Sequence, residues 1–163
     1  ATKKQQEQLQ YMSYRDMLTF LFNRNKYIKI LDSHQGKILE NVGTAYIDLN
    51  GLKQINDSQG HEAGDAFIQN AARVLSRVFP DKVYRIGGDE FVIIDEDLNE
   101  AAFVKTIHTL CQALERDQIS VSCGYAWRAS HCSVKTQLEE ADARMYQNKK
   151  LYYSDRRHDR RKN

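Results

Sequence analysis

Acidic residues stand at the ends of two apolar segments of the chain, and carboxylates placed in this way can hold a divalent cation. Asp89 and Glu90 interrupt the apolar segment 82–94, and Asp48 lies near the end of the apolar segment 44–49. Adjacent carboxylates repel one another unless a cation or another partner lies between them. A solvated hairpin tip would account for Asp89 and Glu90 alone. The second acidic strand end favours a shared metal site over that explanation.

Short strands must position these carboxylates. Residues 82–86 and 91–94 are rich in Val, Ile, Tyr and Phe, a composition that favours strands. Gly87-Gly88 between them predicts a tight hairpin, because glycine adopts positive φ without a steric penalty. Residues 44–49 predict a further strand with the same kind of composition.

The segment after that further strand predicts a short helix whose first turn can bind a phosphate. The first backbone N–H groups of a helix, here those of Gly51 and Leu52, have no intrahelical partner. These donors and the helix dipole both favour an anion. Lys53 adds a positive charge one residue further on.

Together these segments resemble the GGDEF domain family, the diguanylate cyclases of bacterial signalling. Residues 87–91 read Gly-Gly-Asp-Glu-Phe without a change, and the block 48–65 stands at the expected distance before them. The resemblance covers about residues 16–149. Further matches lie at Asp16-Met17-Leu18-Thr19, Asn23-Arg24, residues 122–126, Ala141-Asp142, Tyr146 and Lys149.

The resemblance implies an α/β fold of the nucleotide-cyclase or palm type, with a mixed, mainly antiparallel central sheet covered by helices. The alternation of helical and strand patterns along the chain agrees with this class. Apolar spacing predicts helices over 1–14, 26–31, 103–114 and 136–150, a helix from His61 to Pro80 with Asp65 in its first turn, a strand over 119–127 and a polar loop over 32–42.

Three parts follow from these patterns. Residues 1–15 are expected to form a linker or signalling helix, 16–154 the GGDEF domain and 155–163 a charged, disordered tail. The first helix has a sparse apolar face. It either pairs with a second copy, as the resemblance implies, or is a frayed, solvated end. The resemblance also implies an upstream sensor domain that this sequence lacks.

The resemblance assigns Mg²⁺, with Mn²⁺ as an alternative, to Asp48, the Leu49 carbonyl, Asp89 and Glu90, with two ions per site. Such ions lower the pKa of an attacking hydroxyl and neutralise a triphosphate. Asp89 and Glu90 are also the candidate catalytic residues. Glu90 could bind the metal or assist the attacking hydroxyl, and the sequence leaves both open.

The resemblance assigns GTP to the residues around the short helix. Asn56 and Asp65 supply hydrogen-bond acceptors suited to guanine, and His61 stands at a matching position without a stated role. Lys53 and Lys149 match the lysines that hold the triphosphate, beside the backbone of Gly51 and Leu52.

The resemblance implies that two copies, each holding one GTP, condense them into cyclic di-GMP and release two pyrophosphates. The alternative is a catalytically weak or inactive GGDEF domain that binds GTP or partner proteins. Tyr152-Tyr153 favours this alternative, because these residues replace the Gly-Arg that the family has after its lysine. A palm-type transferase acting on nucleic acid is disfavoured by the net charge of only +2.

Other departures from the family pattern affect single sites. Phe20 replaces a glycine, and Asn50 replaces a second aspartate. The inhibitory product site of the family is Arg-x-x-Asp. Asp81 fits its aspartate, but Val78 occupies the arginine position and Arg77 is one residue away. This predicts weak or absent product inhibition.

Composition agrees with one globular domain. The chain has 163 residues, of which 41% are hydrophobic and 28% charged, enough for one core. No segment is long and apolar enough to cross a membrane, so we expect a cytoplasmic domain without direct membrane insertion. Cys111, Cys123 and Cys132 form no CxxC pair and suit a reducing compartment with buried thiols.

Overall fold

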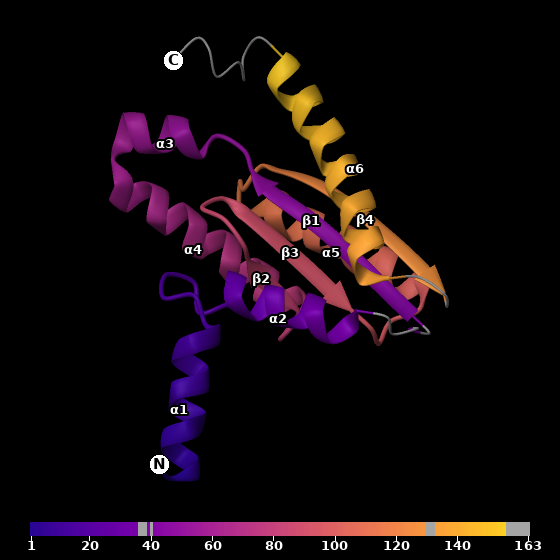
Figure 1. Ribbon diagram of the computed structural model, residues 1–163. Coiled ribbons are helices and arrows are strands. Elements are labelled where there is room, and N and C mark those ends of the chain that lie inside the picture. Colours follow the sequence, from indigo (N-terminus) through magenta and orange to yellow (C-terminus); the bar gives the residue numbers. More distant parts are fainter. Residues whose placement is uncertain (36–38, 40, 130–132, 156–163) are drawn as a thin grey trace.

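A computed structural model describes residues 1–35, 39, 41–129 and 133–155 of the chain (Figure 1). Its elements are, in order, α1 (Lys3–Tyr14), α2 (Arg24–His34), β1 (Asn41–Leu49), α3 (Leu52–Gln59), α4 (His61–Val78), β2 (Val83–Arg85), β3 (Glu90–Asp95), α5 (Glu100–Arg116), β4 (Val121–Ala129) and α6 (Val134–Ser154). The expected α/β class is confirmed.

The strands form one four-stranded sheet in the order β2-β3-β1-β4. Each neighbouring pair is antiparallel, which confirms the mainly antiparallel sheet. The register places Asp48 opposite Glu90 on one side and opposite Ser122 on the other. The end of β1 is therefore enclosed by both of its neighbours.

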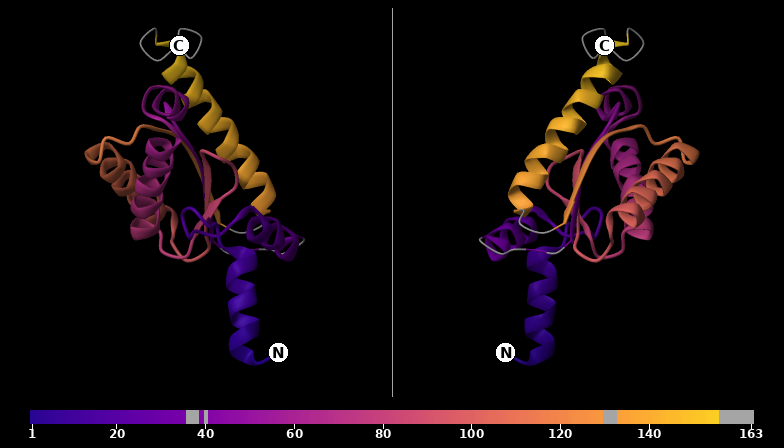
Figure 2. Two further views of the ribbon diagram at one scale, coloured as in Figure 1. Left: turned by 90° about the vertical axis from the view of Figure 1, so that its left-hand side faces the viewer. Right: turned by 90° about the vertical axis from the view of Figure 1, so that its right-hand side faces the viewer.

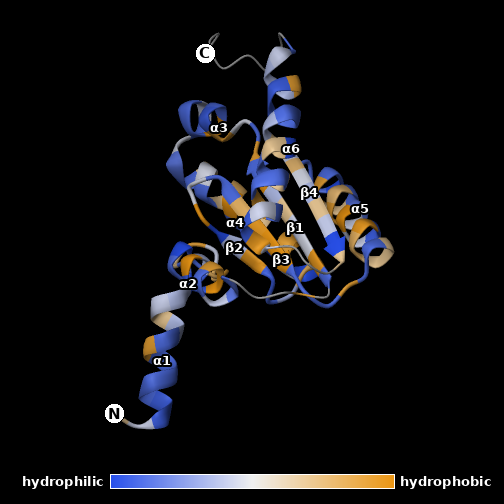
Figure 3. Ribbon diagram, turned by 45° about the vertical axis from the view of Figure 1, so that its right-hand side comes forward, coloured by the Kyte–Doolittle hydropathy of each residue, from blue (hydrophilic) through white to orange (hydrophobic). Residues whose placement is uncertain are grey.

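Helices cover both faces of the sheet. Figure 2 shows α4 and α5 on one side and α6 on the other, and Figure 3 shows hydrophobic residues gathered where helices meet strands. A Cβ on Gly124 of β4 would lie only 2.2 Å from the Ala141 carbonyl oxygen of α6, so glycine permits this close crossing. Fully buried side chains of the core include Ile47, Leu49, Leu75, Phe91, Phe103, Ile107 and Leu110.

Helix α1 projects away from the rest of the domain (Figure 1). It has no buried residue, and Leu9 and Met12 are 60% and 66% exposed. Its end is held by Asn23, whose side-chain Nδ2 donates to the Ser13 carbonyl at 2.9 Å. The same side chain accepts from the Lys26 backbone N–H and caps α2. The helix predicted over 1–14 is present, while its signalling role remains a prediction.

Several predicted boundaries were wrong by a few residues. Helix α2 continues to His34 and β1 begins at Asn41, so the loop predicted over 32–42 is shorter. Val42 is fully buried in the sheet, which explains the longer strand. The strand predicted over 119–127 is β4, which begins at Val121 and continues to Ala129.

The last helix is longer than predicted at both ends. Ser133 caps α6 by accepting from the Thr136 backbone N–H, and the buried Val134 joins its first turn to the core. The helix continues to Ser154. Residues 156–163, which make up most of the predicted tail, lie outside the described residues. In the described part of the chain, no helix is long and apolar enough to cross a membrane.

Candidate functional site

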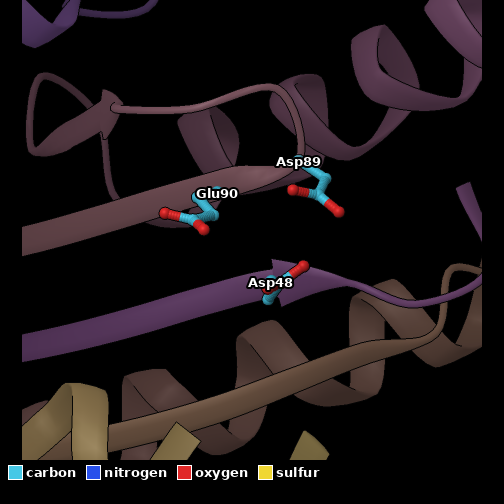
Figure 4. A group of neighbouring side chains, drawn as sticks. All are labelled: Asp48, Asp89 and Glu90. Carbon is cyan, nitrogen blue, oxygen red and sulfur yellow. The ribbon is translucent and has the colours of Figure 1, made fainter. Parts of the chain in front are cut away.

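The acidic residues predicted to share a site lie together in the structure. One carboxylate oxygen from each of Asp48, Asp89 and Glu90 lies within 4.8 Å of the others (Figure 4). The end of β1 and the start of β3 bring them together. The Leu49 N–H donates to the Asp89 carbonyl at 2.9 Å, directly beyond the Asp48–Glu90 pair of the ladder. The carboxylates that the sequence placed together therefore lie together in the fold, and their metal-binding and catalytic roles remain predictions.

The hairpin before β3 turns by a different route from the predicted one. Positive φ was expected at Gly87 and Gly88, but among the described residues the glycines with positive φ are Gly51 and Gly60. The Ile86 and Gly87 N–H groups both donate to the Glu90 carbonyl, at 3.0 and 3.4 Å, and close the turn. A Cβ on Gly88 would meet no atom within 4 Å. Gly88 is exposed at the hairpin tip, and Gly87 before it is half-buried.

Arg85 ties this hairpin to the turn that carries the first family match. Its guanidinium donates to the Gly88 carbonyl at 2.9 Å and to both carboxylate oxygens of Asp16 at 3.1 and 3.2 Å. Asp16 also accepts from the Thr19 N–H and hydroxyl. Phe20 completes that turn at φ 61°, so the turn forms although phenylalanine replaces the family's glycine. Burial alone would raise the pKa of Asp16, but the bonds from Thr19 and Arg85 hold it below its ordinary value.

Asp48 is the most deeply buried of the acidic residues, with 1% of its surface exposed. Its Oδ2 pairs with the Lys149 ammonium of α6, and its Oδ1 is buried without a hydrogen-bond partner in the described residues. Burial raises the pKa of Asp48 to about 6 and the neighbouring Asp89 adds to this, while Lys149 opposes it. An unpaired buried carboxylate oxygen is costly. Together with two further carboxylates it forms the all-oxygen ligand set that Mg²⁺ prefers, so these residues fit a divalent cation.

Tyr46 holds the third carboxylate in place, and sequence reasoning missed it. Its hydroxyl donates to Glu90 Oε2 at 3.1 Å. Burial and the charge of Glu90 both raise the pKa of Tyr46, so the hydroxyl remains a donor. Strand alternation could have revealed this residue, because Tyr46 and Asp48 are two positions apart and share a face of β1.

The predicted phosphate site at the start of α3 is partly occupied by the chain itself. Gly51 precedes the helix at φ 80°, where glycine is favoured. Its N–H was expected to have no partner within its own helix, and its partner is the Tyr153 hydroxyl of α6, at 3.3 Å. Lys53 is exposed on α3. The tyrosine that replaces the family's Gly-Arg thus contacts the expected phosphate site.

The predicted guanine-reading residues lie where α3 and α4 meet. A Cβ on Gly64 would lie 1.8 Å from Asn56 Oδ1, so this glycine allows the half-buried Asn56 to approach α4. Asp65 follows Gly64 and is exposed, as is His61 at the start of α4. Asp65 was predicted in the first turn of α4 but lies in the second, because the helix begins at His61.

Asn50 has a structural role beside the acidic cluster. Its Oδ1 accepts from the Ser122 hydroxyl at 2.9 Å, and its Nδ2 donates to the Ser120 hydroxyl at 3.1 Å. Only 4% of the residue is exposed. These bonds join the end of β1 to the start of β4, so asparagine in place of the second aspartate stabilises the neighbouring strand.

The acidic cluster, the signature hairpin and the sheet order can be compared with known proteins. Residues 13–152 match the family described as "Diguanylate cyclase, GGDEF domain". The chain belongs to the GGDEF family. Its helices and strands have the cyclase palm fold that the family's solved structures share, which confirms the predicted fold.

Relatives of this GGDEF chain carry different names. It is 35% identical over 112 residues to "Probable diguanylate cyclase DgcE" of Escherichia coli, covering 64% of this chain and 10% of DgcE. It is 30% identical over 156 residues to "Cyclic di-GMP phosphodiesterase PdeR" of the same organism, covering 88% of this chain and 24% of PdeR. This sequence therefore spans about a tenth to a quarter of these relatives.

Among solved structures, this GGDEF chain is similar to the coiled coil and GGDEF domain of DgcB from Caulobacter crescentus in complex with c-di-GMP. The TM-score is 0.77 at 27% identity, and the match covers 91% of this chain and 87% of that one.

The residues at the family's product-inhibition position do not form an arginine–aspartate pair. Val78 is half-buried and packs against the core cluster, while Arg77 is exposed. The Asp81 side chain is 84% exposed and lies 4.0 Å from the Arg15 guanidinium.

Proposed function

We propose that this domain condenses two molecules of GTP into cyclic di-GMP and releases two pyrophosphates. The 3′-hydroxyl oxygen of each GTP bonds to the α-phosphorus of the other, and the bond from that phosphorus to the departing pyrophosphate breaks. Each hydroxyl gives up its proton. Because each copy would hold one GTP, the reaction needs two copies whose sites face each other.

The single observation that carries this proposal is the grouping of Asp48, Asp89 and Glu90 at one end of the sheet. With the Leu49 carbonyl, these residues would hold two Mg²⁺ or Mn²⁺ ions. Such ions neutralise a triphosphate and lower the pKa of a hydroxyl. The buried Oδ1 of Asp48, which has no hydrogen-bond partner in the described chain, supports this ligand set.

Glu90 and Lys149 are the residues beside the reacting groups. The Tyr46 hydroxyl fixes one oxygen of Glu90, which leaves the other free to take a metal or a substrate hydroxyl. Lys149 pairs with Asp48 in this structure. In the proposed complex Asp48 would hold a cation, and Lys149 would bind the triphosphate.

The nucleotide itself would lie along α3 and the start of α4. The backbone N–H groups of Gly51 and Leu52, with Lys53, would hold the phosphates. Asn56 and Asp65 would accept hydrogen bonds from the guanine edge. His61 would line the same site.

The decisive experiment forces two copies together and looks for the product. A parallel leucine zipper fused ahead of α1 should give cyclic di-GMP from GTP and Mg²⁺, measured by chromatography and mass spectrometry. The unfused chain should be much slower at equal concentration. The matched control is Asp89→Asn in the same fusion, which keeps the fold and loses a charged ligand. No cyclic di-GMP from a folded fusion that binds GTP would overturn the proposal.

A second function is favoured by one observation. The Tyr153 hydroxyl accepts the Gly51 N–H that a phosphate would otherwise use, which weakens the expected phosphate site. The alternative is a GGDEF domain that binds GTP weakly, or partner proteins, and relays a signal without turnover. GTP binding without product in the zipper fusion would support this alternative.

The proposed activity suits a cytoplasmic location, where GTP is available. We propose that residues 1–15 link the GGDEF domain, 16–154, to a further segment of a longer signalling protein. The exposed Leu9 and Met12 of α1 would then pair with a second copy. Proteins with and without α1 can be compared by sedimentation to test this role.

A further inference from the structure

Two cysteine thiols from different elements meet on the face of the sheet opposite α6. Cys111 lies on α5 and Cys123 on β4, and their thiols are hydrogen-bond partners. Both are half-buried and pack against the core between α5 and the sheet. Cys123 follows Ser122, the residue opposite Asp48, so the Cys123 and Asp48 side chains lie on opposite faces of the sheet.

The thiol pair is accessible from a surface cavity of about 580 Å³. Cys111 and Cys123 both line this cavity, with polar residues of the segment between α5 and β4 around its mouth. A small solute can therefore reach the sulfur atoms without unfolding the domain. The residues that line this cavity do not include the proposed metal or guanine ligands.

The chemistry of the pair is asymmetric. The hydrogen bond from the Cys123 thiol lowers the pKa of Cys111 to about 7, although burial opposes this. The pKa of Cys123 is raised well above its ordinary value by the same contact and by burial. A thiolate is the reactive form of cysteine, and the lowered pKa favours it at Cys111. Cys111 would then act as the nucleophile and Cys123 would resolve its oxidised form.

We propose that Cys111 and Cys123 form a dithiol site that a hydroperoxide oxidises to a disulfide between α5 and β4. The Cys111 thiolate attacks one peroxide oxygen, breaking the O–O bond and giving a sulfenic acid and an alcohol or water. The Cys123 sulfur then attacks the sulfenic sulfur and displaces water. Overall two thiols lose two electrons and two protons, and the peroxide is reduced.

The bond would join α5 to the strand that supports the acidic cluster. Ser120 and Ser122, on either side of Val121 at the start of β4, hold Asn50 next to Asp48. Disulfide formation restricts the unfolded chain and stabilises the domain, provided that the folded geometry accepts the bond. Oxidation of the two thiols would therefore tether β4, the strand next to the proposed metal ligands.

The test uses the full 163-residue chain carrying Cys132→Ser, which removes the third thiol of the sequence. Hydrogen peroxide is added in small excess to the folded protein, and intact mass and free thiols are measured. We expect loss of the mass of two hydrogen atoms, loss of both thiols, a monomeric product and a higher Tm. Dithiothreitol should restore the starting mass.

Single-thiol proteins supply the controls. With Cys123→Ser added, Cys111 should gain oxygen and not lose hydrogen. With Cys111→Ser added, Cys123 should react much more slowly. Gain of oxygen on both thiols of the parent, a disulfide only between chains, or a lower Tm after oxidation would each overturn the proposal. None of these measurements depends on cyclase activity, so the site is tested separately from the proposed function.

Discussion

The Tyr153 hydroxyl, near the end of α6, accepts a hydrogen bond from the backbone N–H of Gly51, 3.3 Å away at the start of α3. A nucleotide phosphate that uses this N–H must displace the hydroxyl. A net protein hydrogen bond is worth about 1 kcal/mol. We expect Tyr153→Phe to tighten GTP binding by about 5-fold, measured by calorimetry with a non-hydrolysable GTP analogue.

Tyr146→Phe is the matched control, because Tyr146 lies on the same helix and is exposed. Its affinity for the analogue should equal that of the unmodified protein. Weaker binding by Tyr153→Phe would mean that the hydroxyl contributes to nucleotide binding, in place of the missing arginine.

The acidic cluster should be required for turnover. Asp89→Asn removes one charged ligand, and a bound metal is worth several kcal/mol of transition-state stabilisation. We therefore expect the rate of cyclic di-GMP formation by the zipper fusion to fall at least ~100-fold, because a loss of several kcal/mol of transition-state stabilisation slows a reaction by at least this factor. The circular dichroism spectrum should be unchanged, since Asp89 lies in the turn before β3. Full activity would refute the metal assignment.

Asp48 should give the metal-free domain a pH-dependent stability. Its pKa is raised in the fold from 3.8 to about 6, so the folded state binds the proton more tightly than the unfolded chain. The stability that this proton supplies is complete below pH 3.8 and is lost as the pH rises through about 6. Asp48→Asn removes the ionisation. The free energy of unfolding of Asp48→Asn minus that of the unmodified protein should be larger at pH 7.5 than at pH 5. The expected increase is on the order of 1–2 kcal/mol.

Urea unfolding at the two pH values, with EDTA present, measures this difference. Mg²⁺ should stabilise the unmodified protein at pH 7.5 and have little effect on Asp48→Asn. If the two proteins differ in unfolding free energy by the same amount at both pH values, the fold does not raise the pKa of Asp48.

Local sequence predicted the acidic cluster because each ligand ends or begins a strand with a clear apolar pattern. Asp48 and Asp89 could be placed in one site from that pattern and the family signature. The Lys149–Asp48 pair could not, because it joins residues 101 positions apart through the packing of α6 on the sheet. Residue types alone do not determine how α6 crosses the sheet. The family resemblance nevertheless assigned Lys149 to the site.

Other errors came from assuming that one residue type has one use. Gly87 and Gly88 were expected to supply positive φ, yet backbone bonds to Glu90 close the turn without it. The Gly51 N–H was expected to have no partner within its helix, and its partner is the Tyr153 hydroxyl of α6. Tyr153 lies 102 positions later in the chain, so local sequence patterns do not reveal this contact.

Guanine should be preferred over adenine. Guanine presents N–H donors where adenine presents an acceptor, and mismatched buried polar groups are left unpaired. We expect GTP to bind at least ~100-fold more tightly than ATP, and Asp65→Ala to shrink this gap. Asp57→Ala is the charge-matched control on the neighbouring α3, where Asp57 is exposed. Equal binding of GTP and ATP by calorimetry would rule out the proposed guanine site.

Feedback inhibition by cyclic di-GMP should be weak or absent at the family's usual site. Gripping a phosphate or a guanine edge there needs an arginine fork. Val78 is half-buried against the core and offers no such group, and Arg77 points about 100° away on the same helix. Asp81 alone would repel a phosphate, and its side chain is 84% exposed, with the Arg15 guanidinium 4.0 Å away.

The measurement is a titration of cyclic di-GMP against the initial rate of the zipper fusion. We expect little inhibition at micromolar product, and no change on Asp81→Ala, because that aspartate lacks its arginine partner. Val78→Arg should add the missing donor at the cost of a half-buried apolar contact, so its Tm is measured alongside. Strong inhibition of the unmodified protein that Asp81→Ala abolishes would mean that Arg77 or Arg15 replaces the missing arginine.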